Sequence, residues 1–177
     1  MYADFTHYDV KTKIGLLLFT ALLGGLFIDS MGFVLSKAYN LGNPLDGYAS
    51  LGKWFLLLIQ GKTHWVNTQF SLEPSTPVDY IVGLGIHLGI CLLDAFLFLY
   101  ISFVVLKANP RLNLALLLMW GLLIMPFFIQ MPAMGLGYAG SLAENGHILR
   151  WRSFICHSTF GVGIWLAPLL FHQLKNK

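Results

Sequence analysis

The chain has 177 residues, of which 56% are hydrophobic and only 11% are charged. An ordinary soluble domain has roughly 25% charged residues, so this composition excludes a soluble globular fold. The length suits a single domain, residues 1–177, and leaves no room for a separate catalytic domain beside a membrane bundle. The net charge of +3 is spread thinly with no basic run, which argues against a nucleic-acid partner.

Four apolar stretches are long enough to cross about 30 Å of hydrocarbon, which takes roughly 20 helical residues. Asp4 and Asp9 precede the first stretch, so we expect it to remain as a helix and not to be a cleaved signal peptide. The expected helices cover residues 14–36, 80–106, 112–141 and 151–173. The sequence therefore predicts an all-α membrane protein with four transmembrane helices in a compact bundle and both termini on one side.

Two regions of this pattern are irregular. Pro126 and Pro132 interrupt the third stretch, and because proline removes a backbone donor we expect that helix to bend or to end in irregular backbone. The connection between the first two helices contains the apolar run WFLLLI, within residues 51–60. This run is too short to span, so we expect an interfacial or re-entrant segment there.

Small residues spaced four apart predict where helices approach each other closely. The pairs are Ala21 with Gly25, Gly85 with Gly89, and Ala133 with Gly137. In the last helix Gly161 and Gly163 also lack side chains and allow a close approach. Helix packing alone would explain all of them.

Four ionisable residues interrupt the apolar stretches, at a cost of roughly 2.5 to 3.5 kcal/mol each at the bilayer centre. They are Asp29, His87, Asp94 and His157. At 1.5 Å per helical residue, Asp29, His87 and His157 each lie about 9 to 12 Å from the nearer end of their helix. Those three ends share one membrane face, because the first helix ends where the second and fourth begin. We therefore expect one polar pocket below that face.

Gln130 falls near the same level and completes the predicted ligand-binding or proton-carrying set of Asp29, His87, Gln130 and His157. The long loop that carries His64, together with Arg152, is expected to roof this pocket. The alternative is purely structural, with the histidines and carboxylates satisfied by neighbouring backbone carbonyls or by hydroxyls such as those of Ser158 and Thr159.

His87, Cys91 and Asp94 are spaced i, i+4 and i+7, so they share one helical stripe. Buried inert thiols are the simpler interpretation of Cys91 and Cys156. A disulfide between them is not expected, because Cys91 would lie roughly 9 Å deeper than Cys156. The roles of the two cysteines and of Asp94 stay open.

Histidine, methionine and thiol ligands suit a soft metal such as Cu(I), and two histidines on facing helices could bind a haem. The candidate metal ligands are His87, Met131 and His157. The chain has no CxxC and no HxxxH pair, so the cofactor is left unknown, with a metal ion or a haem as candidates.

Longer motifs follow one another along nearly the whole chain. They are FIDSMG with Asp29, GKW at 52–54 and GKTHW at 61–65, PVDYIVGLGIH, PFFIQMPAMGLGYAGS, and the run containing Arg152, Ser153, His157, Phe160, Gly161 and Gly163. On these stretches the sequence resembles an uncharacterised family of small bacterial inner-membrane proteins, domain-of-unknown-function family 2938. Three residues depart from the family pattern: Cys91, Asp94 and Met131.

The resemblance implies a location in the bacterial inner membrane and points to Asp29, His64, His87, Gln130, Arg152 and His157, without assigning an activity. The positive-inside rule gives six basic residues on the side of the termini and five on the other, so we expect both termini in the cytoplasm. Lys53 and Lys62 lie deep in the long loop and count for less.

The leading hypothesis is binding or transport of a small polar solute, a proton or a metal ion. A membrane-embedded oxidoreductase or haem-binding subunit is the first alternative, in which the histidines act as acid, base or haem ligands. A non-catalytic assembly factor is the second. Whether the chain is an enzyme stays open. The lipid bilayer is the expected partner, with a small ligand, a second copy or another subunit as further candidates.

Overall fold

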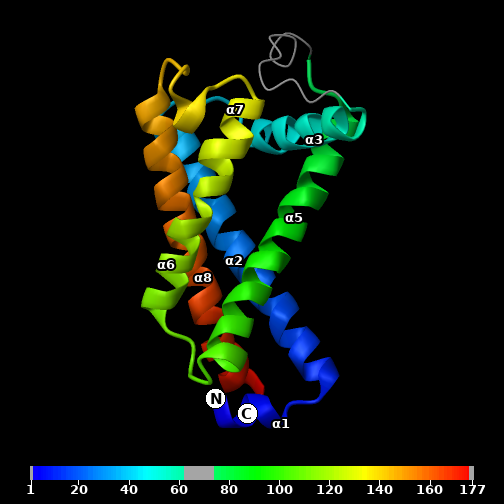
Figure 1. Cartoon of the computed structure of the whole chain (residues 1–177), viewed down its shortest axis with the longest axis vertical. Helices are drawn as coiled ribbons and strands as arrows, with labels where there is room; N and C mark the ends of the chain where they lie inside the picture. The colour runs from blue at the N-terminus through cyan, green and yellow to red at the C-terminus, as the bar shows by residue number, and fades with distance from the viewer. Residues whose placement is uncertain (1, 62–73, 176–177) are drawn as a thin grey trace. The chain divides into compact units, whose positions relative to one another are not determined.

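The computed structural model describes residues 2–61 and 74–175, and every regular element assigned in these ranges is a helix. Four of the helices are long and apolar enough to cross a membrane: Val10–Ala38, Pro77–Val105, Leu112–Ala133 and Gly146–Lys175 (Figure 1). A shorter helix, α3 (Asp46–Ile59), follows the first of them. These features confirm the predicted all-α class, with four candidate spans and a segment between the first two. The chain is a multi-pass membrane protein.

The first span, α2 (Val10–Ala38), extends beyond the expected 14–36 at both ends. Capping hydrogen bonds set where it begins and where it stops. It follows the short helix α1 (Tyr2–His7). Asp9 precedes it and accepts a hydrogen bond from the Thr12 backbone N–H at 2.9 Å, which is N-cap geometry. At the other end the backbone N–H of Leu41 donates to the Ser36 carbonyl at 2.9 Å. The intervening Asn40 has a φ of 52°, as left-handed helix ends require.

The second span is α5 (Pro77–Tyr100), continued by the π-helical turn η1 (Ile101–Val105). Asp79 closes the start of this helix, because its Oδ2 accepts from the Thr76 backbone N–H at 2.7 Å, which is the carboxylate half of a capping box. Pro77 occupies the first helical position, where its missing N–H would have no partner in any case. This arrangement starts the helix at Pro77 and not at the expected residue 80.

The third span consists of α6 (Leu112–Leu122), the π-helical turn η2 (Pro126–Gln130) and α7 (Met131–Ala133). The span is interrupted between Leu122 and Pro126, as the sequence predicted for Pro126. The interruption expected at Pro132 needs correction, because this residue lies inside α7. The expected end at residue 141 needs correction, because the span stops at Ala133. Gly135, Gly137 and Gly140 follow with φ values of 76°, 71° and 73°, which glycine adopts without the steric penalty of other residues. Only the short 3-10 turn η3 (Tyr138–Gly140) is helical there.

The fourth span, α8 (Gly146–Lys175), begins at Gly146 and not at the expected residue 151. A Cβ atom on Gly146 would collide with the carbonyl of Gly140, so the tight turn before α8 depends on glycine. Arg150 Nη1 donates to the Ala139 carbonyl at 3.0 Å, which joins this turn to the helix.

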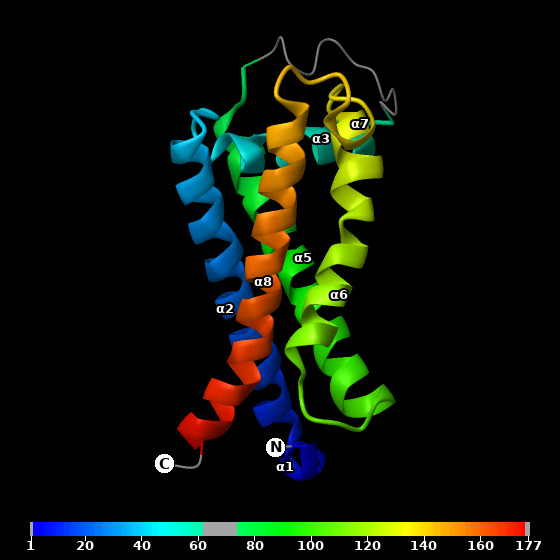
Figure 2. The same ribbon diagram turned by 90° about the vertical axis from the view of Figure 1, so that its left-hand side faces the viewer.

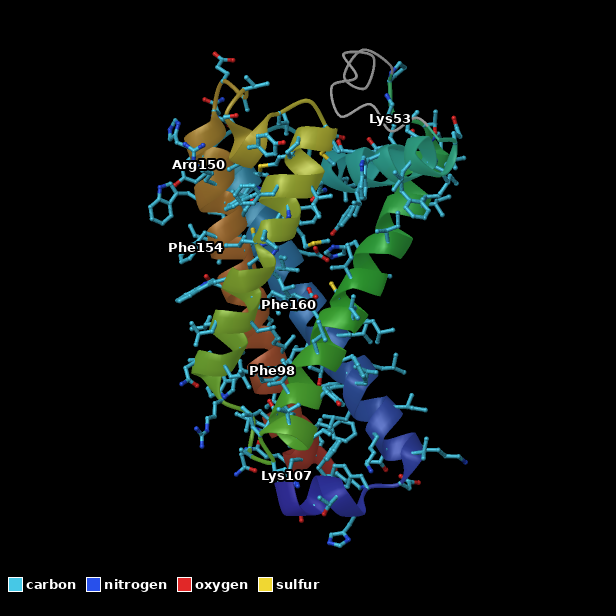
Figure 3. All side chains as sticks on the ribbon, in the orientation of Figure 1. Lys53, Phe98, Lys107, Arg150, Phe154 and Phe160 are labelled. Carbon is cyan, nitrogen blue, oxygen red and sulfur yellow. The ribbon has the colours of Figure 1, made fainter. Side chains whose placement is uncertain are left out.

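Contacts divide the chain into two compact units, and each is described by itself. Unit 1 comprises Met1–Met31, Leu88–Gly121 and Cys156–Lys177, and unit 2 comprises Gly32–His87 and Leu122–Ile155. In unit 1, Phe98 of α5 and Phe160 of α8 are almost fully buried (Figure 3). A Cβ atom on Gly163 would lie only 2.9 Å from Gly24 Cα. The backbones of α2 and α8 therefore meet in the core of this unit.

The start of the chain contacts the last turns of α8 in unit 1, and Figure 2 shows the two ends at the same end of the spans. The Tyr8 hydroxyl lies 3.3 Å from His172 Nδ1. Lys175 Nζ donates to Thr12 Oγ1 at 3.2 Å and lies 4.1 Å from the centroid of the Tyr8 ring. Both ends of the described chain therefore lie at the same end of this unit, as four crossings require.

Candidate functional site

The predicted binding residues lie on all four spans. Asp29 is on α2, His87 on α5, Gln130 on η2 and His157 on α8, and all four side chains are partly buried. Asp29 and His157 belong to unit 1, whereas His87 and Gln130 belong to unit 2. The pocket formed by all four stays a prediction.

Asp29, His87 and His157 each take part in at least one hydrogen bond, ring contact or electrostatic interaction. This is how ionisable groups in apolar helices are usually accommodated. The hydroxyls suggested by the sequence as structural partners have bonds of their own within unit 1. The Thr159 hydroxyl donates to the Cys156 carbonyl at 2.8 Å, and Ser158 Oγ accepts from Trp120 Nε1 at 2.9 Å.

His87 contacts an aromatic side chain of unit 2 that sequence analysis missed. The ring centroids of Tyr48 and His87 lie 5.1 Å apart at an angle of 57°, a tilted packing geometry favourable for aromatic rings. Tyr48 comes from α3, which begins at Asp46 and so starts before the expected segment 51–60. Tyr48 and Gly52 are four residues apart, and this spacing could have indicated one helical face.

The contact between α3 and α5 depends on two glycines that face each other. A Cβ atom on Gly52 would collide with the Asp79 carbonyl and lie 2.7 Å from Gly83 N, and one on Gly83 would collide with the Tyr48 carbonyl and lie 2.9 Å from Gly52 N. The two backbones are in direct contact, which only residues without side chains allow. Helix α3 crosses the start of α5 (Figure 1). The Tyr48 ring and the His87 ring meet beside this crossing.

Two charged residues of unit 2 are nearly inaccessible. Lys53 on α3 is 8% exposed and Asp79 on α5 is 6% exposed. Asp79 has a structural role, because its Oδ2 accepts from both the backbone N–H and the hydroxyl of Thr76. Lys53, labelled in Figure 3, was expected to be a loop charge, and its burial is a finding that the local sequence did not indicate.

Arg152 lies in the second turn of α8 and belongs to unit 2. Its Nε is buried and has no hydrogen-bond acceptor among the described residues. The other predicted roof residue, His64, lies outside the described residues.

Cys91 and Cys156 are both buried in unit 1, as expected, and are not joined in a disulfide. Met131, a candidate metal ligand, is buried in unit 2. Within residues 2–61 and 74–175 no group of three or more histidine, cysteine, aspartate and glutamate side chains is arranged to hold a metal ion.

A comparison with protein families matches residues 19–171 to the model of a protein family of unknown function, DUF2938. Searches of curated proteins and of solved structures found no match.

Proposed function

The chain belongs to the DUF2938 family of proteins of unknown function, and we propose that it binds or transports a small polar solute, a proton or a metal ion within its spans. The proposal assigns the ligand-binding or proton-carrying role to Asp29, His87, Gln130 and His157. We further propose that these residues share a site, as their similar depth along the helices predicts.

The observation that supports this function is the partial burial of the three ionisable side chains. Asp29, His87 and His157 are neither exposed on the apolar surface of their helices nor sealed in a core. Ionisable residues inside spans usually face the protein interior or a wet cavity and mark substrate or proton pathways. His87 in addition has Tyr48 against its ring, which gives it a defined orientation.

Conservative variants separate this function from a purely structural role. Interhelical hydrogen bonds in membranes average only about 0.6 kcal/mol, so His87→Gln, His157→Gln and Asp29→Asn should change the melting temperature little. The same variants remove a metal ligand or a proton carrier, so ligand binding or proton flux should fall steeply. His147→Gln and Glu144→Gln are matched controls, because both side chains are exposed at the start of α8 or just before it.

Three readouts cover the three ligand classes in purified, reconstituted protein. They are proton flux into vesicles with a trapped pH dye, metal content by mass spectrometry, and retained small molecules by native mass spectrometry. At least one should be lost in both histidine variants and reduced in Asp29→Asn, with the controls like wild type. Equal behaviour of wild type and variants in all three readouts would overturn the proposal, as would unfolding in step with each loss.

The shared site has its own test. Cysteines introduced in pairs at positions 29, 87 and 157, in a Cys91→Ser, Cys156→Ser background, should crosslink with short bifunctional reagents. Failure of every pair in folded protein would remove the shared site and leave the individual residues to be judged by the variants above.

A further inference from the structure

Arg152 and Arg150 lie two residues apart on α8 and are accommodated differently. Arg150 is exposed, and its Nη1 donates to the Ala139 carbonyl at 3.0 Å. Arg152 is partly buried, with a buried Nε for which the described residues offer no acceptor. Its Nη2 faces Gly32 of α2, also in unit 2, and would lie 3.6 Å from a Cβ atom built on that glycine.

A buried guanidinium donor without an acceptor is costly. Arginine cannot shed its proton in a protein and presents its N–H groups as a rigid planar fork. Leaving a buried donor unpaired costs about 1 to 3 kcal/mol, and more when the group is charged. Some acceptor is therefore needed at Nε.

The described carboxylates of unit 2 do not fill this role. Asp79 is bonded to Thr76 through both the backbone and the hydroxyl, Asp46 accepts from the Tyr80 hydroxyl at 3.0 Å, and Glu144 is exposed. The described part of this unit carries four basic side chains, Lys37, Lys53, Arg150 and Arg152, against these three acids. No described carboxylate of unit 2 is bonded to Nε, so an anion from outside the chain would supply the missing acceptor.

We propose that Arg152 is a binding site for an oxyanion, a phosphate or a carboxylate, held by the guanidinium beside Gly32. Nε and one terminal nitrogen of a guanidinium match the two oxygens of such a group. A Cβ atom at position 32 would already be in van der Waals contact with Nη2, so glycine keeps the space beside the guanidinium open at this position. The site does not depend on the function proposed for the Asp29 and His residues.

Two measurements distinguish a soluble anion from a lipid headgroup. In the first, delipidated protein in a neutral detergent is melted with sodium phosphate, with acetate, or with chloride at equal ionic strength. In the second, the phosphorus content of protein purified from membranes is measured. A soluble ligand raises the wild-type melting temperature by about 3 °C or more over chloride, whereas a lipid ligand appears as phosphorus that copurifies with the protein.

Arg152→Gln should abolish whichever signal wild type gives, and Arg150→Gln should retain it. Arg152→Lys keeps the positive charge but not the planar guanidinium, so it should lose most of the signal. If Arg152→Gln does not fold, Arg152→Lys serves as the test. The proposal is overturned if wild type gives neither signal. A full signal in folded Arg152→Gln or Arg152→Lys overturns it equally.

Discussion

Asp9 sets the start of α2 at the residue scale. Hydrogen bonds from the Thr12 hydroxyl and from the Thr12 backbone N–H hold the pKa of the Asp9 carboxyl below its ordinary value of 3.8. Because this pKa is depressed, the cap contributes its full stabilisation at every pH above the ordinary carboxyl pKa. The contribution is lost as the pH falls through the pKa of Asp9 in the folded protein. The contribution is therefore complete at neutral pH and disappears only in acid.

Replacing Asp9 tests the cap directly. Asp9→Ala should speed hydrogen exchange in the first turn of α2 at neutral pH, because the Thr12 N–H loses its acceptor. Asp9→Asn should stay close to wild type there, since asparagine is an equally good N-cap, but should lack the acid-induced loss of protection. Exchange measured by mass spectrometry in lipid nanodiscs, corrected for intrinsic rates, checks both. Unchanged exchange in Asp9→Ala would contradict the assignment.

The sequence predicts single residues well where their chemistry contrasts with their surroundings. Asp29, His87 and His157 could be singled out because each interrupts an apolar run. The burial of Lys53 could not, because it depends on what packs against α3. The Tyr48 contact with His87 escaped for the same reason, since it forms only when two helices cross.

At the scale of elements, the crossing of α3 and α5 depends on two glycines. Gly52→Ala or Gly83→Ala would place a methyl group against backbone atoms that cannot rotate away, so α3 must shift. Overpacking of this kind costs roughly 1 to 3 kcal/mol. We expect a lower melting temperature and weaker crosslinking between cysteines placed on the two helices.

Gly85 and Gly89 provide the matched controls on α5. A Cβ atom at either position would meet no heavy atom within 4 Å in the described part of the chain. Alanine there should be neutral or stabilising by up to about 1 kcal/mol through helix propensity. Equal destabilisation by alanine at positions 83 and 85 would show that the crossing is not what glycine serves.

Tyr8 joins the start of the chain to the end of α8 through its hydroxyl and its ring. Burial, together with the negative charge of Asp4, raises the pKa of Tyr8, so the hydroxyl stays neutral at physiological pH. Tyr8→Phe removes the contact with His172 and keeps the ring under Lys175, whereas Tyr8→Ala removes both. A hydrogen bond contributes about 0.5 to 1.5 kcal/mol and an exposed cation–π contact about 0.5 to 1. The rate of proteolysis near α1 should therefore rise from wild type to Tyr8→Phe and again to Tyr8→Ala. Equal proteolysis rates in the two variants would rule out the ring contact.

Helix existence could be predicted from the sequence far better than helix ends and partners. The break at Pro126 follows from chemistry local to the residue. The end of the third span at Ala133 depends on which glycines adopt left-handed backbone conformations, which the spacing does not encode. Small-residue pairs were expected at Ala21 with Gly25 and at Gly85 with Gly89. Gly163, also expected to allow close approach, does so against Gly24, whereas the contact of Gly52 with Gly83 was not predicted. A spacing along one helix does not identify the partner helix.

At the scale of the whole molecule, the order of the four spans assigns each connection to one of two membrane faces. The face with the start of α2 and the end of α8 carries five described basic residues: Lys11, Lys13, Lys107, Arg111 and Lys175. The other face carries four, of which Lys53 is buried and Arg152 partly so. The two faces therefore differ more in accessible basic residues than in the sequence count of six against five. The positive-inside rule then favours cytoplasmic termini.

Thiol labelling tests this orientation in intact cells. Asn43, Glu144 and Asn109 are exposed residues in connections between spans, the first two on one face and the third on the other. With cysteine at each position in a Cys91→Ser, Cys156→Ser background, a membrane-impermeant maleimide should label positions 43 and 144 and not 109. Permeabilised cells, in which all three should react, control for accessibility. Labelling at 109 alone would reverse the orientation, and different results at 43 and 144 would contradict the four-span order, because the end of α2 and the start of α8 must share a face.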